Sequence, residues 1–358
     1  MKYCTRCVTP DTRPRLTFDK DGVCSACQWH EDKQTKVNWK ERRKSLESLC
    51  NKFRGHGYFN VIVPCSGGKD GTYVAWKLKH EFDMNPLCVT FYPQMQTPIG
   101  QTNLENFKAS GFNHITLSPD AELYRKIATV GFIEQGRPKL PFVTGISTAI
   151  FRLSALYDVP FIMYGEEGEK EYGGAVDARE KIDRRYLVKY YYSGIDPAKH
   201  GWWWQLPQQD DLDRIYATHW SKFEDWDPQD HARLAKDKCG FEMLVGGSVG
   251  TFTNYAQLDD VLQDLHTYMM FIKFGFGRCT SDASIEIRRG RMTREQGVNV
   301  VNQLDGLFPV EYLGMYLDYF EMTEKEFWEI IDRWVNHDIL HKTGKPEKPY
   351  ALRDTQCV

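Results

Sequence analysis

The chain has 358 residues, of which 41% are hydrophobic and 27% are charged, and its formal net charge is −3. This balance is ordinary for a globular protein of about two domains. It excludes a collagen-like repeat or a long coiled coil, and the lack of a basic excess argues against a nucleic-acid-binding protein. No apolar run approaches the roughly 18 residues of a membrane span, and no secretory signal is visible, so we expect a cytoplasmic protein that binds no membrane.

Four cysteines near the N-terminus form two Cys-x-x-Cys pairs. They are Cys4 with Cys7 and Cys24 with Cys27, and sixteen residues separate the pairs. Two residues between thiolates let one turn present both sulfurs to a tetrahedral ion, and this spacing is typical of structural zinc. A segment this short cannot bury a core, so the metal would supply its folding energy. We predict a closed, non-catalytic zinc knuckle over residues 1–35, with a redox-active dithiol as the alternative.

Residues 36–180 alternate between helical and strand patterns. Helices are expected at 36–54, 72–82, 101–110, 119–135 and 145–157, and buried strands at 59–64, 86–91, 114–117 and 159–164. Strands that alternate with helices favour a parallel α/β sheet. We therefore predict one α/β domain over residues 36–180.

A glycine-rich turn, Ser66–Thr72, joins the first strand to the next helix. Adjacent glycines let backbone N–H groups converge on a phosphate, and the helix N-terminus adds partial positive charge. The turn is not a Walker A loop, because Lys69 directly follows the second glycine, and it does not fit the dinucleotide-binding fingerprint. We interpret it as a phosphate-binding loop, and the alternative is a turn that merely connects the two elements.

This turn resembles the signature Ser-Gly-Gly-x-Asp-Ser of the PP-loop ATP pyrophosphatases, which cleave ATP between its α and β phosphates. Gly71 replaces the last serine of the signature, so either Thr72 supplies the hydroxyl or one phosphate contact is missing. The resemblance implies a doubly wound, HUP-like PP-loop sheet that binds ATP and Mg²⁺ at the carboxyl ends of its strands. The residues then expected to bind the nucleotide are Ser66, Gly67, Gly68, Lys69, Asp70, Gly71, Thr72, Val89, Thr90, Phe91 and Gly165.

Two acidic residues, Glu166 and Glu167, follow the fourth strand on the edge expected to carry the phosphate loop. Carboxylates there would bind Mg²⁺ or stabilise ammonium before it attacks, and a solvated acidic loop is the alternative. With Lys69 and Asp70 they are our catalytic candidates. For Asp70, a helix N-terminal cap is the alternative to a metal ligand.

The pattern changes beyond residue 180. Residues 181–240 mix many Tyr and Trp residues with Gly, Pro and charged residues, and we expect an irregular insertion or cover. Residues 241–358 are expected to form a mostly helical region that binds substrate or a partner. Its predicted helices are 255–273, 293–303 and 323–336.

A basic block begins at Lys273-Phe274-Gly275-Phe276-Gly277-Arg278 and continues through residues 287–295. With the cysteine pairs and the phosphate loop, it resembles the N-acetyl sugar amidotransferases (WbpG/PseA type) of surface-polysaccharide and flagellin-glycan biosynthesis. The resemblance implies a ligase that converts a sugar acetamido group into an acetamidino group through an adenylated intermediate, for lipopolysaccharide O-antigen or a related glycan. It also implies a separate glutaminase subunit as the source of ammonia.

The implied substrate is an N-acetylated sugar, either nucleotide-linked or acidic. Arginine and lysine bind phosphate and carboxylate groups well, although a charged run is often only a solvated face. The residues expected to bind the substrate are Lys273, Arg278, Asp282 and Arg288.

Two other functions stay open. One is a PP-loop tRNA thiolase, which would need further cysteines near the nucleotide and a basic face for RNA. The other is a non-catalytic, zinc-containing nucleotide-binding module, in which Gly71 would mark a lost activity.

Overall fold

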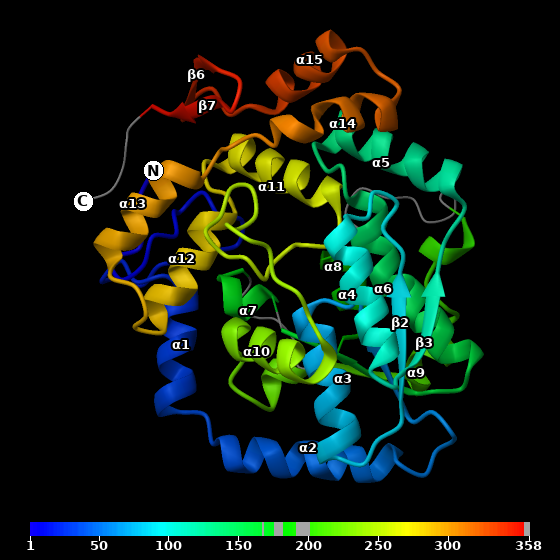
Figure 1. Cartoon of the computed structure of the whole chain (residues 1–358). Coiled ribbons are helices and arrows are strands. Elements are labelled where there is room, and N and C mark those ends of the chain that lie inside the picture. Colours follow the sequence, from blue (N-terminus) through cyan, green and yellow to red (C-terminus); the bar gives the residue numbers. More distant parts are fainter. Residues whose placement is uncertain (167, 175–181, 191–200, 354–358) are drawn as a thin grey trace.

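The computed structural model (Figure 1) describes residues 1–166, 168–174, 182–190 and 201–353. A five-stranded parallel sheet with strand order β3-β2-β1-β4-β5 lies at its centre. The strands are β1 (Val61–Pro64), β2 (Pro86–Phe91), β3 (Asn113–Leu117), β4 (Phe161–Tyr164) and β5 (Tyr216–His219). From β1 the chain adds β2 and β3 on one side, then β4 and β5 on the other. This confirms the predicted doubly wound α/β sheet, with a topological switch point between β1 and β4.

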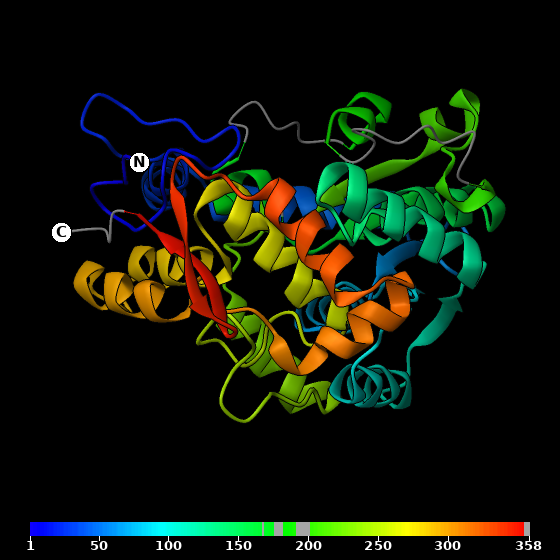
Figure 2. The same cartoon turned by 90° about the horizontal axis from the view of Figure 1, so that it is seen from above.

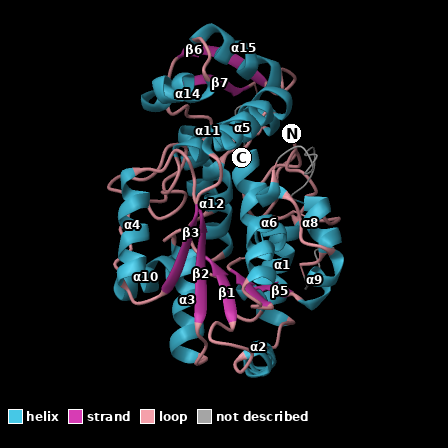
Figure 3. Cartoon of the chain, turned by 90° about the vertical axis from the view of Figure 1, so that its right-hand side faces the viewer, coloured by secondary structure: helices cyan, strands magenta, loops and turns pink. Residues whose placement is uncertain are grey.

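Helices cover both faces of the sheet, as Figure 3 shows for α6 and α10. They are α2 (Trp39–Phe53), α3 (Lys69–Glu81), α4 (Pro98–Ala109), α5 (Ala121–Gln135), α6 (Leu140–Leu156), α9 (Gln209–Arg214) and α10 (Pro228–Cys239). Ile62 packs with residues of α5, α6 and α9, whereas Val61 and Val63 pack with residues of α2, α3 and α10. Strands buried on both faces are typical of parallel sheets, which explains the continuous apolar run in β1. In the part of the chain that the structure describes, no helix is long and apolar enough to cross a lipid bilayer.

The C-terminal region is mostly helical, as predicted, and ends in a hairpin (Figure 2, yellow to red). Its elements are α11 (Val261–Phe274), α12 (Arg278–Arg288), α13 (Arg294–Leu304), α14 (Leu313–Phe320), α15 (Glu324–Trp334), β6 (Leu340–Lys345) and β7 (Lys348–Leu352). Helices were expected at the positions of α11, α13 and α15, but α12 and the antiparallel β6–β7 hairpin were not foreseen. Ala128 and Phe132 of α5 pack into this region's core, which joins it to the sheet domain.

The N-terminal segment ends in α1 (Ser25–Thr35), which lies beside the short helix α7 (Gly168–Tyr172). A buried ion pair of 2.8 Å joins Lys33 of α1 to Glu171 of α7. The hydroxyls of Thr9 and Ser284 lie 2.9 Å apart and join the same segment to α12. The segment therefore packs against both α7 and α12.

The expectation that residues 181–240 form an irregular cover is wrong for part of this range. Residues 216–219 form β5, which pairs with β4 and completes the sheet, and residues 228–239 form α10 on one of its faces. The strand was missed because Tyr-Ala-Thr-His lacks a β-branched apolar run, and the helix because its buried face is made of small or polar residues such as Ala232 and His231. The region also contains α8 (Arg184–Tyr190), and residues 181 and 191–200 lie outside the described residues.

Candidate active site

A cavity of about 310 Å³ opens at the carboxyl ends of β1 and β2, a size typical of small-molecule sites. The phosphate loop forms one wall, together with Val89, Thr90 and Phe91 at the end of β2. The other walls come from α4, α6, the region of β4 and α7, the segment before α11, and the first turns of α11 and α12. The main residues there are Gly100, Asn103, Lys139, Phe142, Ile146, Glu166, Tyr172, Phe241, Tyr255, Ala256, Gln257, Leu258, Asp259, Gln263 and Arg278.

Close backbone packing explains two glycines of the phosphate loop. Gly67 has a φ of +82°, and a Cβ atom on it would lie 2.6 Å from the backbone nitrogen of Leu104 in α4. A Cβ atom on Gly71 would lie 2.7 Å from the carbonyl oxygen of Pro64 at the end of β1. The serine of the family signature therefore has no room at position 71. The next residue, Thr72, is buried with its hydroxyl 3.7 Å from the thiol of Cys65, and it does not line the cavity.

Asp70 lines the cavity at the first turn of α3. One oxygen, Oδ1, accepts hydrogen bonds from Trp226 Nε1 (2.9 Å) and His231 Nδ1 (2.8 Å), and Oδ2 pairs with Lys69. Burial by itself would raise the pKa of Asp70. The charge of Lys69 and the hydrogen bond from His231 outweigh burial and bring this pKa below its usual range. The cap residue of α3 is Gly68, which has no side chain, and Asp70 lies in the first turn with its two oxygens engaged by Trp226, His231 and Lys69.

Glu166 lines the same cavity directly after β4. Burial, and then the negative charge of Asp70, raise the pKa of Glu166 to about 7. A carboxyl group that titrates near neutral pH suits general acid–base chemistry. Gly165 lies behind it, where an added Cβ atom would be 3.0 Å from Cβ of Asp70. Glu167 lies outside the described residues.

Arg278 reaches the cavity from the first position of α12. Its Nε atom forms a 2.8 Å ion pair with Asp282, and its guanidinium lies 5.8 Å from the ring centre of Tyr172. Asp282 also accepts hydrogen bonds from the hydroxyls of Thr251 (2.7 Å) and Thr253 (2.8 Å). Asp282 does not line the cavity; it holds Arg278 in place.

Lys273 and Arg288, which we expected to bind substrate, lie away from this cavity. The Lys273 ammonium donates to the backbone carbonyl of Gln135 (2.8 Å) at the end of α5. Arg288, at the other end of α12 from Arg278, donates to the backbone carbonyl of Glu171 (2.9 Å). Of the three basic residues expected to bind the substrate, only Arg278 therefore lines the cavity.

Sequence reasoning missed several residues of the site, among them Lys139, Tyr172, Trp226 and His231. Lys139 is buried, and its ammonium lies 2.8 Å from Oε1 of Gln263 and 3.1 Å from a carboxylate oxygen of Asp260. None of these residues stands in a motif. Long-range folding alone brings Lys139 and Tyr172 to the cavity, and Trp226 and His231 to Asp70.

The four N-terminal cysteines are buried, and their sulfurs form a compact group that could hold a metal ion. The sulfur atoms of Cys4 and Cys27 lie 3.9 Å apart, and those of Cys7 and Cys24 lie 3.7 Å apart. A tetrahedral zinc with bonds of about 2.3 Å separates its sulfurs by about 3.8 Å, so the donor set fits. Hydrogen bonds with Cys24 and Cys27 lower the pKa of Cys4 to about 6. The pKa values of Cys24 and Cys27 are raised, because of their hydrogen bonds with the neighbouring thiols and because of burial. Four thiols this close cannot all ionise without a cation between them.

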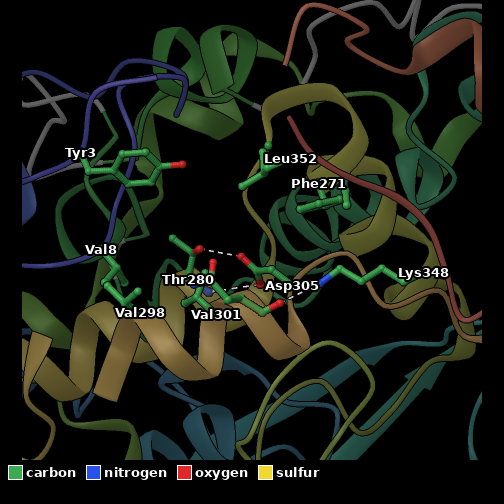
Figure 4. A pocket seen from close by; sticks show the side chains of 12 residues that line it. Tyr3, Val8, Phe271, Thr280, Val298, Val301, Asp305, Lys348 and Leu352 are labelled. Atoms are coloured by element: carbon green, nitrogen blue, oxygen red, sulfur yellow. Dashed lines mark hydrogen bonds between the residues drawn. The ribbon is translucent and has the colours of Figure 1, made fainter. Parts of the chain in front are cut away.

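A second cavity, of about 90 Å³, lies between the N-terminal segment, α13 and the hairpin (Figure 4). Figure 4 shows the Thr280 hydroxyl pointing to the carboxylate of Asp305, which it meets at 2.5 Å. Asp305 also accepts from the backbone nitrogen of Gly277 (2.8 Å), and burial raises the pKa of Asp305 to about 6. Asp305 thus anchors the start of α12, the helix that carries Arg278 to the larger cavity.

Residues 249–353 match the family model of the C-terminal domain of the WbpG-like lipopolysaccharide (LPS) biosynthesis protein. One similar solved structure is a predicted subunit of tRNA methyltransferase from Methanocaldococcus jannaschii, with 17% identity and a TM-score of 0.30; the match covers 55% of this chain and 82% of that one. Another is NMN synthetase from Francisella tularensis, with 12% identity, a TM-score of 0.24, and coverage of 59% and 90%. No curated protein matches the chain.

Proposed function

We propose that the chain is an ATP-dependent N-acetyl sugar amidotransferase. The premise is that residues 249–353 form a domain of the WbpG-like family of LPS biosynthesis, as the sequence led us to expect. It would convert the acetamido group of a sugar into an acetamidino group and release AMP and pyrophosphate. One observation carries the proposal: Arg278 and residues 255–259 of the WbpG-like domain line the same cavity as the phosphate loop.

The phosphate-loop side of the cavity suits the triphosphate of ATP. Backbone N–H groups at the start of α3 and the ammonium of Lys69 would bind the phosphates, because this is where the helix carries partial positive charge. The backbone of Val89–Phe91 would meet adenine. Asp70 would hold Mg²⁺, which supplies charge neutralisation for the phosphates.

The Glu166 side suits the amide and the attacking ammonia. The acetamido oxygen attacks the α phosphorus, and pyrophosphate leaves; ammonia then adds to the activated carbon, which expels AMP together with the original oxygen. Glu166, whose pKa is raised to about 7, would take the proton that the attacking nitrogen must lose. Arg278 would stabilise the negative charge that develops on oxygen.

Ammonia would come from a separate glutaminase subunit. Glutamine hydrolysis needs a thiolate nucleophile, and reactive thiolates are partly exposed with a lowered pKa. All described cysteines are buried. Burial raises the thiol pKa of each one outside the N-terminal group, to about 12 for Cys50 and Cys65 and upward also for Cys88, Cys239 and Cys279. A tRNA thiolase would need further cysteines near the nucleotide. Among the described cysteines only Cys65 lines the cavity, so this alternative gains no support.

We also propose that the four-cysteine group holds structural zinc, so that a careful preparation contains about one zinc per chain. Cys24→Ser should lose the metal and lower the melting temperature, since α1 packs on α7 beside the cavity. Cys50→Ser, which changes a buried cysteine outside the group, is the matched control. Elemental analysis that finds no zinc in the wild-type protein would contradict this assignment.

The direct test is to incubate the chain with ATP, Mg²⁺, ammonium and a panel of N-acetylated sugars, including nucleotide-linked and acidic ones. One sugar should give AMP and pyrophosphate together with a product about one mass unit lighter, and ¹⁵N-ammonium should cancel that mass loss. Glutamine should replace ammonium only when a glutaminase is added. Release of ADP in place of AMP, or turnover with glutamine in the absence of a second protein, would overturn the proposal.

A further inference from the structure

The carboxylate of Asp70 is bound by two side chains that lie far away in the sequence. Trp226 Nε1 and His231 Nδ1 both meet Oδ1, at 2.9 and 2.8 Å, and both residues are almost fully buried. Two donors occupy Oδ1, whereas Oδ2 pairs with the ammonium of Lys69 and keeps a further lone pair with which it can contact a ligand.

The ring of Tyr73 fixes the ring of His231 by stacking on it, with centres 3.7 Å apart and planes 9° apart. The Tyr73 hydroxyl donates to one oxygen of Glu224 (2.5 Å), and Trp220 Nε1 donates to the other (3.1 Å). Neither the ring of His231 nor its support can turn without breaking these contacts, so the direction of its N–H bond is set before any ligand binds.

The WbpG-like domain holds the same segment in place. Arg291 forms a 2.6 Å ion pair with Asp227, the residue that caps α10, and Arg289 forms a 2.7 Å pair with Asp225. Arg289 also donates to the backbone carbonyl of Trp226. Two arginines of the basic block therefore act on the segment that carries Trp226 and His231, and not on the cavity itself.

We propose that His231 and Trp226 are positioning residues for Asp70: they fix its carboxylate so that Oδ2 faces the metal-bound phosphates of ATP. Two N–H donors on one oxygen favour the ionised carboxylate and define its rotation. Partners of this kind behind a metal ligand typically change metal affinity or activity by about 10- to 100-fold when removed. The inference rests on the proposed function only in that the cavity binds MgATP; it does not depend on the sugar.

Two substitutions of His231 separate the hydrogen bond from the packing. His231→Phe keeps a flat ring on Tyr73 and removes the donor, whereas His231→Asn offers a side-chain N–H close to the position of Nδ1 and removes the ring. Trp226→Phe removes only the second donor. His80 is also packed beside an aromatic ring, that of Trp76 (4.8 Å), but it is exposed and lies outside the cavity, so His80→Phe is the matched control.

The measurement is calorimetric binding of a non-hydrolysable ATP analogue to the full chain across a Mg²⁺ titration, with the melting temperature recorded for each variant. We expect His231→Phe to weaken binding about tenfold or more in Mg²⁺ and to raise the Mg²⁺ concentration required. His231→Asn should stay within a few fold of wild type, Trp226→Phe should lie between the two, and His80→Phe should not change binding. If His231→Phe does not fold, Trp226→Phe carries the test.

Wild-type Mg²⁺ dependence in folded His231→Phe and Trp226→Phe would overturn the inference. So would a His231→Asn variant as weak as His231→Phe, because packing alone would then explain the loss. Failure of the proposed function looks different: the chain would bind MgATP in the expected pattern, yet no N-acetylated sugar would be amidinated.

Discussion

Two walls of the cavity, one at the phosphate loop and one around Arg278, are built in different ways. The phosphate-loop wall is one strand–turn–helix unit, in which Gly67 and Gly71 let backbone segments approach to distances that no side chain allows. A second wall combines Glu166, Tyr172 and Arg278, which lie on three separate segments. The hydrogen bond from Arg288 of α12 to the backbone carbonyl of Glu171 in α7 (2.9 Å) joins two of these segments, and Asp282 supports Arg278 from within α12. If the proposed reaction is correct, substitutions in the first wall should act through the phosphates of ATP, and those in the second through the positions of the groups around the amide.

The largest expected effect is in the first wall. Lys69→Ala removes the ammonium beside Asp70, which would stabilise the developing phosphate charge, and should lower turnover by about a hundredfold or more. Lys77→Ala is the control, because Lys77 is on the same helix but pairs with Glu81 outside the cavity. Quantifying AMP release under saturating ATP tests this. Equal turnover of the two variants would show that the loop does not act on the phosphates.

The second wall is tested by Glu166→Gln, which should lower turnover by about a hundredfold if Glu166 is the base. Because the pKa of Glu166 is raised to about 7, wild-type turnover at constant free ammonia should rise with pH up to about 7 and then level. The variant should lack this rise. A wild-type profile that is flat between pH 5 and 8 would remove Glu166 from the reaction.

The same shift has a consequence for stability. The folded state binds the Glu166 proton more tightly than the unfolded chain, whose group titrates near its ordinary value of 4.5. The proton's contribution to stability is fully present below that value and is lost as pH rises through about 7. Denaturant unfolding of wild type and Glu166→Gln should therefore diverge over this window, with the variant gaining relative stability.

A smaller effect separates Arg278 from the other basic residues. Arg278→Lys keeps the charge but not the shape of the guanidinium, and should lower turnover about tenfold. Lys273→Ala should leave the Michaelis constant for the sugar unchanged, because its ammonium contacts a backbone carbonyl of α5 outside the cavity. Steady-state kinetics on both variants tests which residue contacts the substrate. A raised Michaelis constant for the sugar in Lys273→Ala alone would show that Lys273, and not Arg278, binds the sugar.

The two walls also differ in how far the sequence predicts them. β2 was predicted with its correct bounds, and the phosphate loop and the cysteine group were found from residues adjacent or close in the chain. Such features rest on local geometry, which a short stretch of sequence contains. The pairing of His231 with Asp70 spans 161 residues, and nothing around His231 differs from an ordinary helix. Lys273 and Arg288 were wrongly expected at the site. They are close to Arg278 in sequence, but the structure places them outside the cavity.

The smallest expected effect concerns Gly71, where the family signature and the structure make opposite predictions. By the signature, Gly71→Ser should restore a phosphate contact. In the structure, the Cβ atom would lie 2.7 Å from the Pro64 carbonyl oxygen and 2.8 Å from Cα of Cys65, and backbone atoms cannot yield as a flexible side chain does. We expect Gly71→Ser to lose about 1–3 kcal/mol of unfolding free energy and to gain no ATP affinity.

Gly68 provides the matched control for this test. Its φ of −71° is open to any L-residue, and an added Cβ atom would meet nothing nearer than the hydroxyl of Ser66 at 3.5 Å. Gly68→Ala should therefore unfold at nearly the same denaturant midpoint as wild type, whereas Gly71→Ala should unfold earlier. If instead Gly71→Ser is as stable as wild type and binds ATP more tightly, then α3 can move away from β1. The phosphate-loop wall would in that case be adaptable, contrary to the close backbone packing at Gly67 and Gly71.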